Sequence, residues 1–414
     1  MSRRTRGLVV ALALVLILLV SATGCWNRRE PENLAHALGI GFDIDDTGKY
    51  RVFVQLSNPE GAGAVSQSSE NTASAESAWT VSAVGRTPYE ALFNTVPLFS
   101  RELSVAHVGV IVISERLAQQ GIGPILDVLE RERTLRTTTR IMVARGDVGK
   151  VMSAKVPLEK VTSLGISRAV TVSERERSGL PVKYATDVID TLAQPGKEPL
   201  LAQITVLDEQ GHTRNPNEAS KDVDTNKETN PKPPLKLAGA AVFRGDRMVG
   251  WMDERETRGW GWLTNMVNRT IMVIELPDAG EGEYMTVVIS QVTSKLKPRI
   301  DGDNIRFELK IFADGNIEDQ TASTDFFHSR ENVASMNSRV ATAIRNDVEK
   351  ALRTAQSFNA DVFGLGWLLY RTKYKEWKKV DDRWDEIFPQ ISVDMDIRVD
   401  VRRSGLVTKA GAKR

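Results

Sequence analysis

The stretch VAHVGVIVIS, residues 105–114, is a continuous apolar run that decides how the first part of the chain folds. Such a run is typical of a strand that is covered on both faces of a sheet. Residues 115–133 follow with a helical pattern that is interrupted near Gly121 to Pro124. TTTRIMVARG, residues 137–146, then predicts another strand. Strands and helices in this order indicate a mixed or partly parallel sheet packed by helices.

The residues before this run predict antiparallel strands. YRVFVQL, residues 50–56, alternates apolar side chains along one face, and Asp46-Thr47-Gly48 supplies a turn before it, which predicts a hairpin. AWTVSAVG, residues 78–85, predicts the next strand, and a helix is expected from the Thr87 cap. Residues 57–78 are rich in small and polar side chains, which predicts a mobile loop.

The last part of the chain shows two amphipathic patterns. ISVDMDIRVDVRR, residues 391–403, alternates strictly between apolar and charged side chains, which predicts a strand with one buried face. Residues 330–358 place apolar side chains at steps of three and four, which predicts a long helix. Strands are also expected at 283–300 and 304–317, with a turn at Asp301-Gly302-Asp303. A sheet with one wet face and a helical layer on the other satisfies these patterns.

Together these patterns predict an α+β protein of about three domains, with a mixed sheet in the N-terminal domain, a small β-rich middle domain, and an antiparallel sheet with long helices in the C-terminal domain. The polar, Pro- and Asn-rich residues 208–234 predict a disordered loop in the middle domain. The expected divisions are a signal peptide at 1–24, an N-terminal α/β domain at 25–185, a middle domain at 186–275, a C-terminal α+β domain at 276–403 and a basic tail at 404–414.

The net charge of the chain does not indicate any class of binding partner. The 414 residues carry 55 Lys and Arg against 54 Asp and Glu, which gives a formal net charge of +1. A nearly neutral chain has no general field that would draw nucleic acid toward it. No nucleic-acid partner is therefore predicted.

The N-terminus has the three parts of a secretory signal. Three arginines within the first six residues precede an apolar run at 8–20, and small or polar residues follow at 21–24. The apolar run is 13 residues long, whereas a transmembrane helix needs roughly 20 residues. Export with removal of residues 1–24 is therefore predicted in preference to a membrane-spanning anchor.

Cys25 is the only cysteine, so it cannot form a disulfide within the chain. The stretch Ala22-Thr23-Gly24-Cys25 resembles the bacterial lipobox, in which the cysteine sulfur receives a diacylglyceryl group and the cysteine becomes the first residue. Two acyl chains hold a protein stably on a bilayer, whereas one does so only marginally. Leucine is the usual residue in place of Ala22, and Ala-x-Gly also suits the ordinary signal peptidase, which would release a soluble protein. Lipidation of Cys25 is the preferred interpretation.

Patterns of catalytic residues are mostly missing. The four histidines lie far apart and form no metal-ligand spacing, and P-loop, G-x-S-x-G and G-x-G-x-x-G motifs do not occur. Ser294-Lys295-Leu296-Lys297 matches S-x-x-K, but the S-D-N and K-T-G companions of penicillin-binding active sites are missing. The sequence therefore predicts no catalytic residue, no metal, and no cofactor other than the covalent lipid on Cys25.

Tryptophans are the remaining candidates for a binding surface. Trp251, Trp260 and Trp262 cluster in one segment, and Trp377 and Trp384 lie in another. Exposed tryptophans anchor interfaces, because this residue is enriched at binding hot spots, whereas buried ones pack a core. Trp377 and Trp384 are seven residues apart, which predicts that both lie on one face of a helix packed on a sheet.

Four blocks of sequence occur in an order that is typical of one protein family. The blocks are residues 24–45 (GCWNRREPENLAHALGIGFDID), residues 100–146 around VAHVGVIVIS, residues 237–263 (LAGAAVFRGDRMVGWMDERETRGWGWL), and residues 361–407 around ISVDMDIRVDVRR. In this order they resemble the Ger(x)C spore germination lipoproteins, which are the C subunits of nutrient germinant receptors in endospore-forming bacteria. The resemblance covers nearly the whole chain after Cys25.

The resemblance implies a three-domain α+β ectodomain that a lipid on Cys25 anchors to the outer face of the inner spore membrane. It implies partners, namely an A and a B membrane subunit of the same receptor, and a requirement for nutrient-triggered germination. It supplies no catalytic residue, since the C subunit is not known as an enzyme. Two other classes stay open, a solute-binding lipoprotein of an importer and a cell-wall hydrolase.

Overall fold

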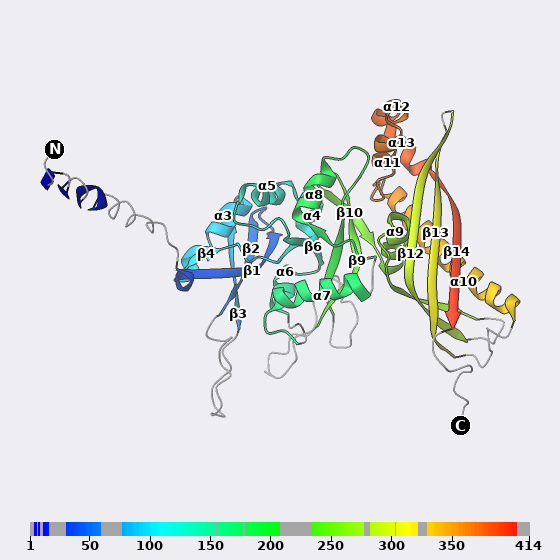
Figure 1. Cartoon of the computed structure of the whole chain (residues 1–414), viewed down its shortest axis with the longest axis horizontal. Coiled ribbons are helices and arrows are strands. Elements are labelled where there is room, and N and C mark those ends of the chain that lie inside the picture. The colour runs from blue at the N-terminus through cyan, green and yellow to red at the C-terminus, as the bar shows by residue number, and fades with distance from the viewer. Residues whose placement is uncertain are drawn as a thin grey trace, which may run out of the picture.

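The computed structural model has two sheets that lie one after the other along a long molecule (Figure 1). The described residues are 4, 5, 7, 8, 11–15, 30–58, 77–154, 156, 158–176, 179–207, 234–276, 282–302, 304–321 and 329–403. Cys25, the predicted tail at 404–414 and nearly all of the predicted loops at 57–78 and 208–234 lie outside them. In the described part of the chain, no helix combines the length and the apolar character needed to cross a membrane.

The large sheet has ten strands and a helical layer on each face. Its strands are β1 (Leu34–Ile44), β2 (Tyr50–Ser57), β3 (Ala78–Gly85), β4 (Glu102–Ser104), β5 (Val110–Ser114), β6 (Arg140–Arg145), β7 (Lys183–Tyr184), β8 (Leu200–Val206), β9 (Leu235–Arg244) and β10 (Arg247–Met252). Its helices are α3 (Pro88–Phe93), α4 (Glu115–Gln120), α5 (Gly123–Arg131), α6 (Val148–Ser153), α7 (Thr162–Glu176) and α8 (Ala185–Leu192).

The strand order of the large sheet is β10-β9-β8-β6-β5-β1-β2-β3, with β4 beside β1 and β7 beside β6. Strand β5 runs parallel to both β1 and β6, and β6 runs parallel to β8. The pairs β1-β2, β2-β3, β8-β9 and β9-β10 are antiparallel. The predicted mixed sheet is therefore confirmed, as is the α+β class.

Strand β5 lies inside the large sheet, and all five of its side chains are buried. Ile111 and Ile113 pack in an apolar cluster with residues of α4 and α5 on one face. Val110 and Val112 pack in a second cluster with residues of α6 and α7 on the other face. Alternate residues of a strand point to opposite faces, so this apolar run supplies two cores at once. The prediction of a strand covered on both faces is confirmed.

The predicted middle domain at 186–275 does not form a sheet of its own. Strands β8, β9 and β10 of this segment extend the large sheet beyond β6, and its last strand, β11 (Thr270–Glu275), joins the small sheet. The backbone N–H and C=O groups along the edge of β6 need hydrogen-bond partners, which β8 supplies. Strand β8 is buried at six of its seven positions, so it fits beside β6 between the helical layers. The strands of this segment are thus divided between the two sheets.

The small sheet has four strands, in the order β11-β12-β13-β14. Here β12 is Tyr284–Asp301, β13 is Asn304–Gln320 and β14 is Ser392–Arg403. Strands β12 and β13 form a long antiparallel hairpin, as predicted. Strand β14 runs parallel to β13, so the prediction of an antiparallel sheet is wrong for this pair. The helical segment between them carries the chain back to the end where β13 begins, which is the connection that a parallel pair needs.

Helix α10 (Arg330–Ser357) covers one face of the small sheet (Figure 1). Its N-cap, Ser329, accepts a hydrogen bond from the backbone N–H of Asn332 at 3.1 Å. Its apolar stripe is buried and consists of Met336, Val340, Ile344, Val348, Ala351, Leu352 and Ala355. The inward positions of β14 belong to the same core and are Val393, Met395, Ile397, Val399 and Val401. Both amphipathic predictions for this region are confirmed.

Helix α9 (Glu254–Thr264) lies between the two sheets and packs on α10. It begins with a capping box, in which Asp253 and Glu256 each accept a hydrogen bond from the backbone N–H of the other. Gly259 faces α10, and a Cβ at this position would clash with the backbone carbonyl of Asp347. The missing side chain of Gly259 therefore lets the two helices approach closely.

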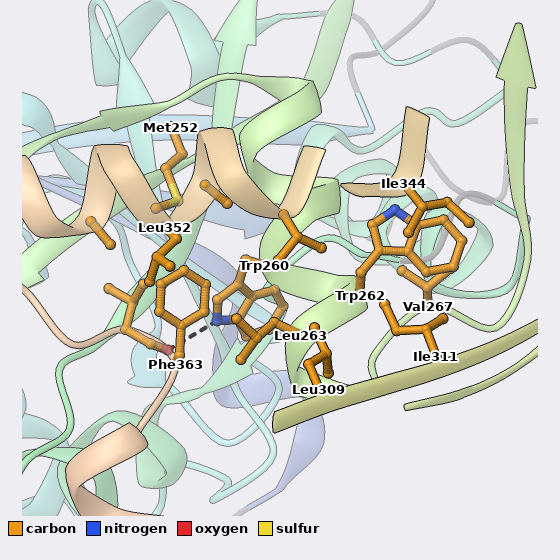
Figure 2. Close-up of a cluster of buried hydrophobic side chains, with 14 of the residues drawn as sticks. Met252, Trp260, Trp262, Leu263, Val267, Leu309, Ile311, Ile344, Leu352 and Phe363 are labelled. Carbon is orange, nitrogen blue, oxygen red and sulfur yellow. Dashed lines mark hydrogen bonds between the residues drawn. The ribbon is translucent and has the colours of Figure 1, made fainter. Parts of the chain in front are cut away.

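The two sheets share one apolar core through α9. Trp260 and Trp262 of α9 belong to a cluster that includes Leu200 and Val242 of the large sheet as well as residues of the small sheet. Figure 2 shows the side chains of this cluster around α9, among them Met252, Leu263, Leu309, Ile311, Ile344, Leu352 and Phe363. Because the core is continuous, the sheets are held together by the same apolar burial that stabilises each of them.

We expect the substitution Gly259→Ala to lower the free energy of unfolding by about 1–3 kcal/mol, because the added methyl group must displace the backbone of α10. The loss should exceed the small gain in helix propensity that alanine brings. Urea unfolding of both proteins measures the difference. Gly109→Ala is the matched control, since a Cβ at Gly109 meets its neighbours at 3.5 Å or more. Equal stability of the two variants would contradict the account.

Candidate functional site

Four of the five predicted tryptophans are buried where the two sheets meet. Trp260, Trp262, Trp377 and Trp384 are each no more than 5% exposed. The indole N–H of Trp260 donates to the carbonyl of Val362 at 3.0 Å, which links α9 to the segment after α10 (Figure 2). These four side chains pack the core and are closed off from the outer surface, although Trp260, Trp377 and Trp384 also line internal cavities.

Trp251 differs from the other tryptophans because it is only half-buried, on β10 of the large sheet. Its indole N–H donates to the Glu115 carboxylate at 2.7 Å, and the Arg145 guanidinium lies over its ring at 5.7 Å from the ring centroid. The polar end of this indole is therefore satisfied within the chain.

Trp377 and Trp384 do not lie on one helix, contrary to the prediction from their spacing. Trp377 ends α12 (Tyr374–Trp377), and Trp384 begins α13 (Trp384–Ile387). The chain leaves the helical conformation between them at Val380, where φ is −129°. Both indoles turn inward, and their ring centroids are 5.3 Å apart.

Asp361 is a buried carboxyl group just before α11 (Leu365–Thr372). Its oxygens accept hydrogen bonds from the backbone N–H groups of Leu365 (3.0 Å) and Gly366 (2.9 Å), and from the indole N–H of Trp384 (3.3 Å). Burial raises the pKa of Asp361 to about 6, although the three donors favour the ionised form. The carboxyl group satisfies the first N–H groups of α11 and positions the indole of Trp384.

Glu198 lies on the loop that leads into β8, next to the segment that holds Asp361. Its backbone N–H donates to the carbonyl of Asp361 at 2.9 Å, and its carboxyl group accepts from the backbone N–H of Gly245 at 2.6 Å. Burial, together with the negative charges of Asp361 and Asp385, raises the pKa of Glu198 to about 7. The backbone of Glu198 therefore joins the loop before β8 to the segment after α10, and the carboxyl group of the same residue has a pKa near neutral pH.

A buried ion pair joins α9 to α10. Asp347 of α10 is 1% exposed and accepts a hydrogen bond from Nε of Arg258 at 2.7 Å. Arg255 adds a longer contact of 3.6 Å, and Lys350 pairs with Asp253 at the start of α9. Removing one member of such a buried pair costs about 3–5 kcal/mol, because the other charge is left without a partner. This ion pair sets how the two helices face each other.

Two cavities lie where the sheets meet. The first has a volume of about 280 Å³ and is lined by residues of both sheets, such as Leu201 of β8 and Leu296 of β12, and by Lys197 and Trp367. The second has a volume of about 310 Å³ and is lined in part by Glu198 and Asp361. Among the residues that the structure describes, no three His, Cys, Asp or Glu side chains lie close enough together to hold a metal ion. The arrangement is suited to holding elements together and to binding a small molecule.

Sequence reasoning missed Asp361, Glu198 and the pair of Arg258 with Asp347. One signal for Asp361 was present, because it stands three residues before a Gly-Leu-Gly stretch that begins a helix. Arg258 and Asp347 are 89 residues apart, so no local pattern could have paired them. Cys25, the predicted lipidation site, lies outside the described residues.

Two family models match the chain in tandem. The model described as "Spore germination protein N-terminal domain" matches residues 27–206, and "Spore germination B3/ GerAC like, C-terminal" matches residues 238–405. The fold and these matches define the class as spore germination proteins. Because the two matches cover most of the chain, it belongs to the Ger(x)C family.

Relatives of the chain cover nearly its whole length. Spore germination protein KC of Bacillus subtilis (strain 168) is 25% identical over 408 residues, which are 95% of this chain and 95% of that protein. Spore germination protein B3 of the same strain is 22% identical, over 96% of this chain and 98% of that protein. The crystal structure of the GerBC protein superposes with a TM-score of 0.52 at 18% identity, over 88% of this chain and 96% of that chain. At this identity the superposition bears on the fold alone.

We expect Glu198 to make the free energy of unfolding fall as the pH rises from about 4.5 to about 7. Its pKa is about 7 in the folded protein and 4.5 ordinarily, so the folded state keeps a proton that the unfolded chain has released. The variant Glu198→Gln should lose this contribution, which is at most about 1.4 kcal/mol per pH unit. Asp361 adds a slope of the same sign between pH 3.8 and about 6, which the variant retains.

Urea unfolding at several pH values measures these slopes. Glu130→Gln is the matched control, because Glu130 is exposed on α5. If the Glu198 variant and the control have the same pH slope as the unmodified chain, Glu198 does not titrate as described.

Proposed function

We propose that the chain is a lipid-anchored, non-catalytic subunit of a spore nutrient germinant receptor, and that it is required for nutrient-triggered germination. The observation that carries this proposal is the tandem family match at 27–206 and 238–405, which begins two residues after Cys25. The C subunit of such a receptor works with an A and a B membrane subunit, and these are the partners we propose. The mature protein would lie on the outer face of the inner spore membrane.

The position of Cys25 supports a role as an anchor. Eight residues lie between Cys25 and Leu34, where β1 begins. A chain of this length spans at most about 30 Å, so a diacylglyceryl group on Cys25 would keep the large sheet close to the bilayer. The lipid is the only covalent group that we propose.

The buried polar groups between the sheets support a non-catalytic role. Asp347 and Asp361 are each engaged by donors of the chain itself, in contacts that hold helices in place. The importer lipoprotein and the cell-wall hydrolase receive no support from the described residues. An importer lipoprotein would have two similar α/β lobes, whereas here one sheet has ten strands and the other has four.

We expect Cys25→Ala to abolish incorporation of labelled palmitate and to impair germination on nutrients, while the ectodomain still folds. Lipid labelling, a nutrient germination assay and an immunoblot of spore membranes measure these outcomes. Ala22→Leu is the matched control, since leucine is the usual lipobox residue and should preserve both labelling and germination. Normal germination of spores that carry only the Cys25→Ala protein would contradict a required anchor. Mass spectrometry that finds an unmodified Cys25 at the mature N-terminus would contradict lipidation itself.

A further inference from the structure

We propose that the cavity of about 280 Å³ between the two sheets binds a small organic anion, a carboxylate or phosphate that carries an apolar group. This binding site goes beyond the proposed receptor function and does not rest on it. Three cationic side chains line the cavity without a carboxylate partner among the described residues, and aromatic faces lie beside two of them. A buried hydroxyl group on the wall likewise has no hydrogen-bond partner in the part of the chain that the structure describes.

Both sheets contribute to the walls of this cavity. Lys183 of β7, Lys197 of the loop before β8 and Leu201 of β8 come from the large sheet. Leu296 of β12 comes from the small sheet, and Arg371 comes from α11 beside it. A molecule in the cavity would therefore contact both sheets at once.

The cations are Lys183, Lys197 and Arg371. Among the described residues, none of the three has a carboxylate oxygen within the 4.0 Å of an ion pair, and Nζ of Lys197 donates only to the side-chain oxygen of Gln194, at 3.2 Å. Nζ of Lys183 lies 5.9 Å from the ring centroid of Trp260, and Cζ of Arg371 lies 5.7 Å from that of Trp367. Unpaired charges of one sign at a cavity cost free energy, which an anion between them would offset.

The electrostatics of Lys197 agree with an excess of positive charge. Burial lowers the pKa of Lys197, and the charges of Lys183 and Arg371 lower it further. The charges of Asp361 and Asp187 oppose this shift by a smaller amount. The carboxyl group on the cavity wall belongs to Glu198. It accepts a hydrogen bond from the backbone N–H of Gly245 and has a pKa of about 7. At neutral pH it therefore offsets only part of the charge of three cations.

The remaining walls define the rest of the ligand. Ser294 lines the cavity, and its hydroxyl group is buried without a hydrogen-bond partner among the described residues. A free hydroxyl group can donate to an oxygen of a carboxylate or phosphate. The apolar part of the ligand would contact the indoles of Trp260 and Trp367 and the side chains of Leu263 and Leu368. These features favour an organic anion over an inorganic one.

Binding at this cavity would stabilise the contact between the sheets, because only the folded arrangement brings the cations together. The test is titration calorimetry and thermal unfolding of the mature chain, which begins at Cys25, in detergent micelles. The probes are benzoate and phenyl phosphate, with neutral benzamide and inorganic phosphate as comparison compounds. We expect at least one of the two organic anions to bind and to raise the Tm, and benzamide and inorganic phosphate to bind at least about tenfold more weakly.

The variants Lys197→Met and Arg371→Gln should each weaken binding of the organic anion by about tenfold or more, because each removes a charge-assisted hydrogen bond. Lys160→Met is the matched control, since Lys160 is exposed and lines neither cavity. Without ligand, Lys197→Met should be no less stable than the unmodified chain, because it relieves repulsion.

Four results would overturn the proposal. The first is that neither organic anion binds, and the second is that benzamide or inorganic phosphate binds as tightly as they do. The third is that Lys197→Met and Arg371→Gln bind the anion like the Lys160 control. The fourth is a large loss of stability in unliganded Lys197→Met, which would make this lysine a structural group.

Discussion

The close contact of α9 with α10 is the constraint on which the rest of the structure depends. Gly259 permits this contact because a larger residue would clash with the backbone of α10, and Arg258 makes it specific by pairing with the buried Asp347. With α9 held there, Trp260 and Trp262 enter the core that both sheets share. The ion pair orients the helices, and the apolar burial around the indoles supplies the main stabilisation.

The contact of α9 with α10 also positions the cavities and the titratable carboxyl group of Glu198 between the two sheets. It brings the loop before β8 against the segment after α10, where the backbone of Glu198 bonds to Asp361. Both cavities adjoin this junction, since Lys197 and Glu198 line each of them. At such a junction, the small-molecule binding proposed above or protonation of Glu198 would alter how the two sheets are held together.

Much of the fold could be predicted from the sequence because its signals are local. The apolar run of β5, the periodicity of α10 and the alternation of β14 each appear within one segment, and each is confirmed. Pairing between distant segments could not be predicted. The placement of β8 beside β6 and the parallel pairing of β14 with β13 depend on which edges are free in the assembled sheets.

The candidate site was less predictable than the fold for the same reason. Tryptophans stood out by their size and rarity, but whether they are exposed or buried depends on contacts across the two sheets. Lys183, Lys197 and Arg371 carry no motif and meet only because the sheets are packed together. The break at Val380, which separates Trp377 from Trp384, also has no proline or glycine to mark it.

The central claim is that the two sheets unfold as one cooperative unit. Differential scanning calorimetry tests it most directly, on the full-length chain in detergent and under conditions where unfolding is reversible. A shared core predicts a single transition in which the calorimetric and van't Hoff enthalpies agree. Two separate transitions, one for each sheet, would contradict the account.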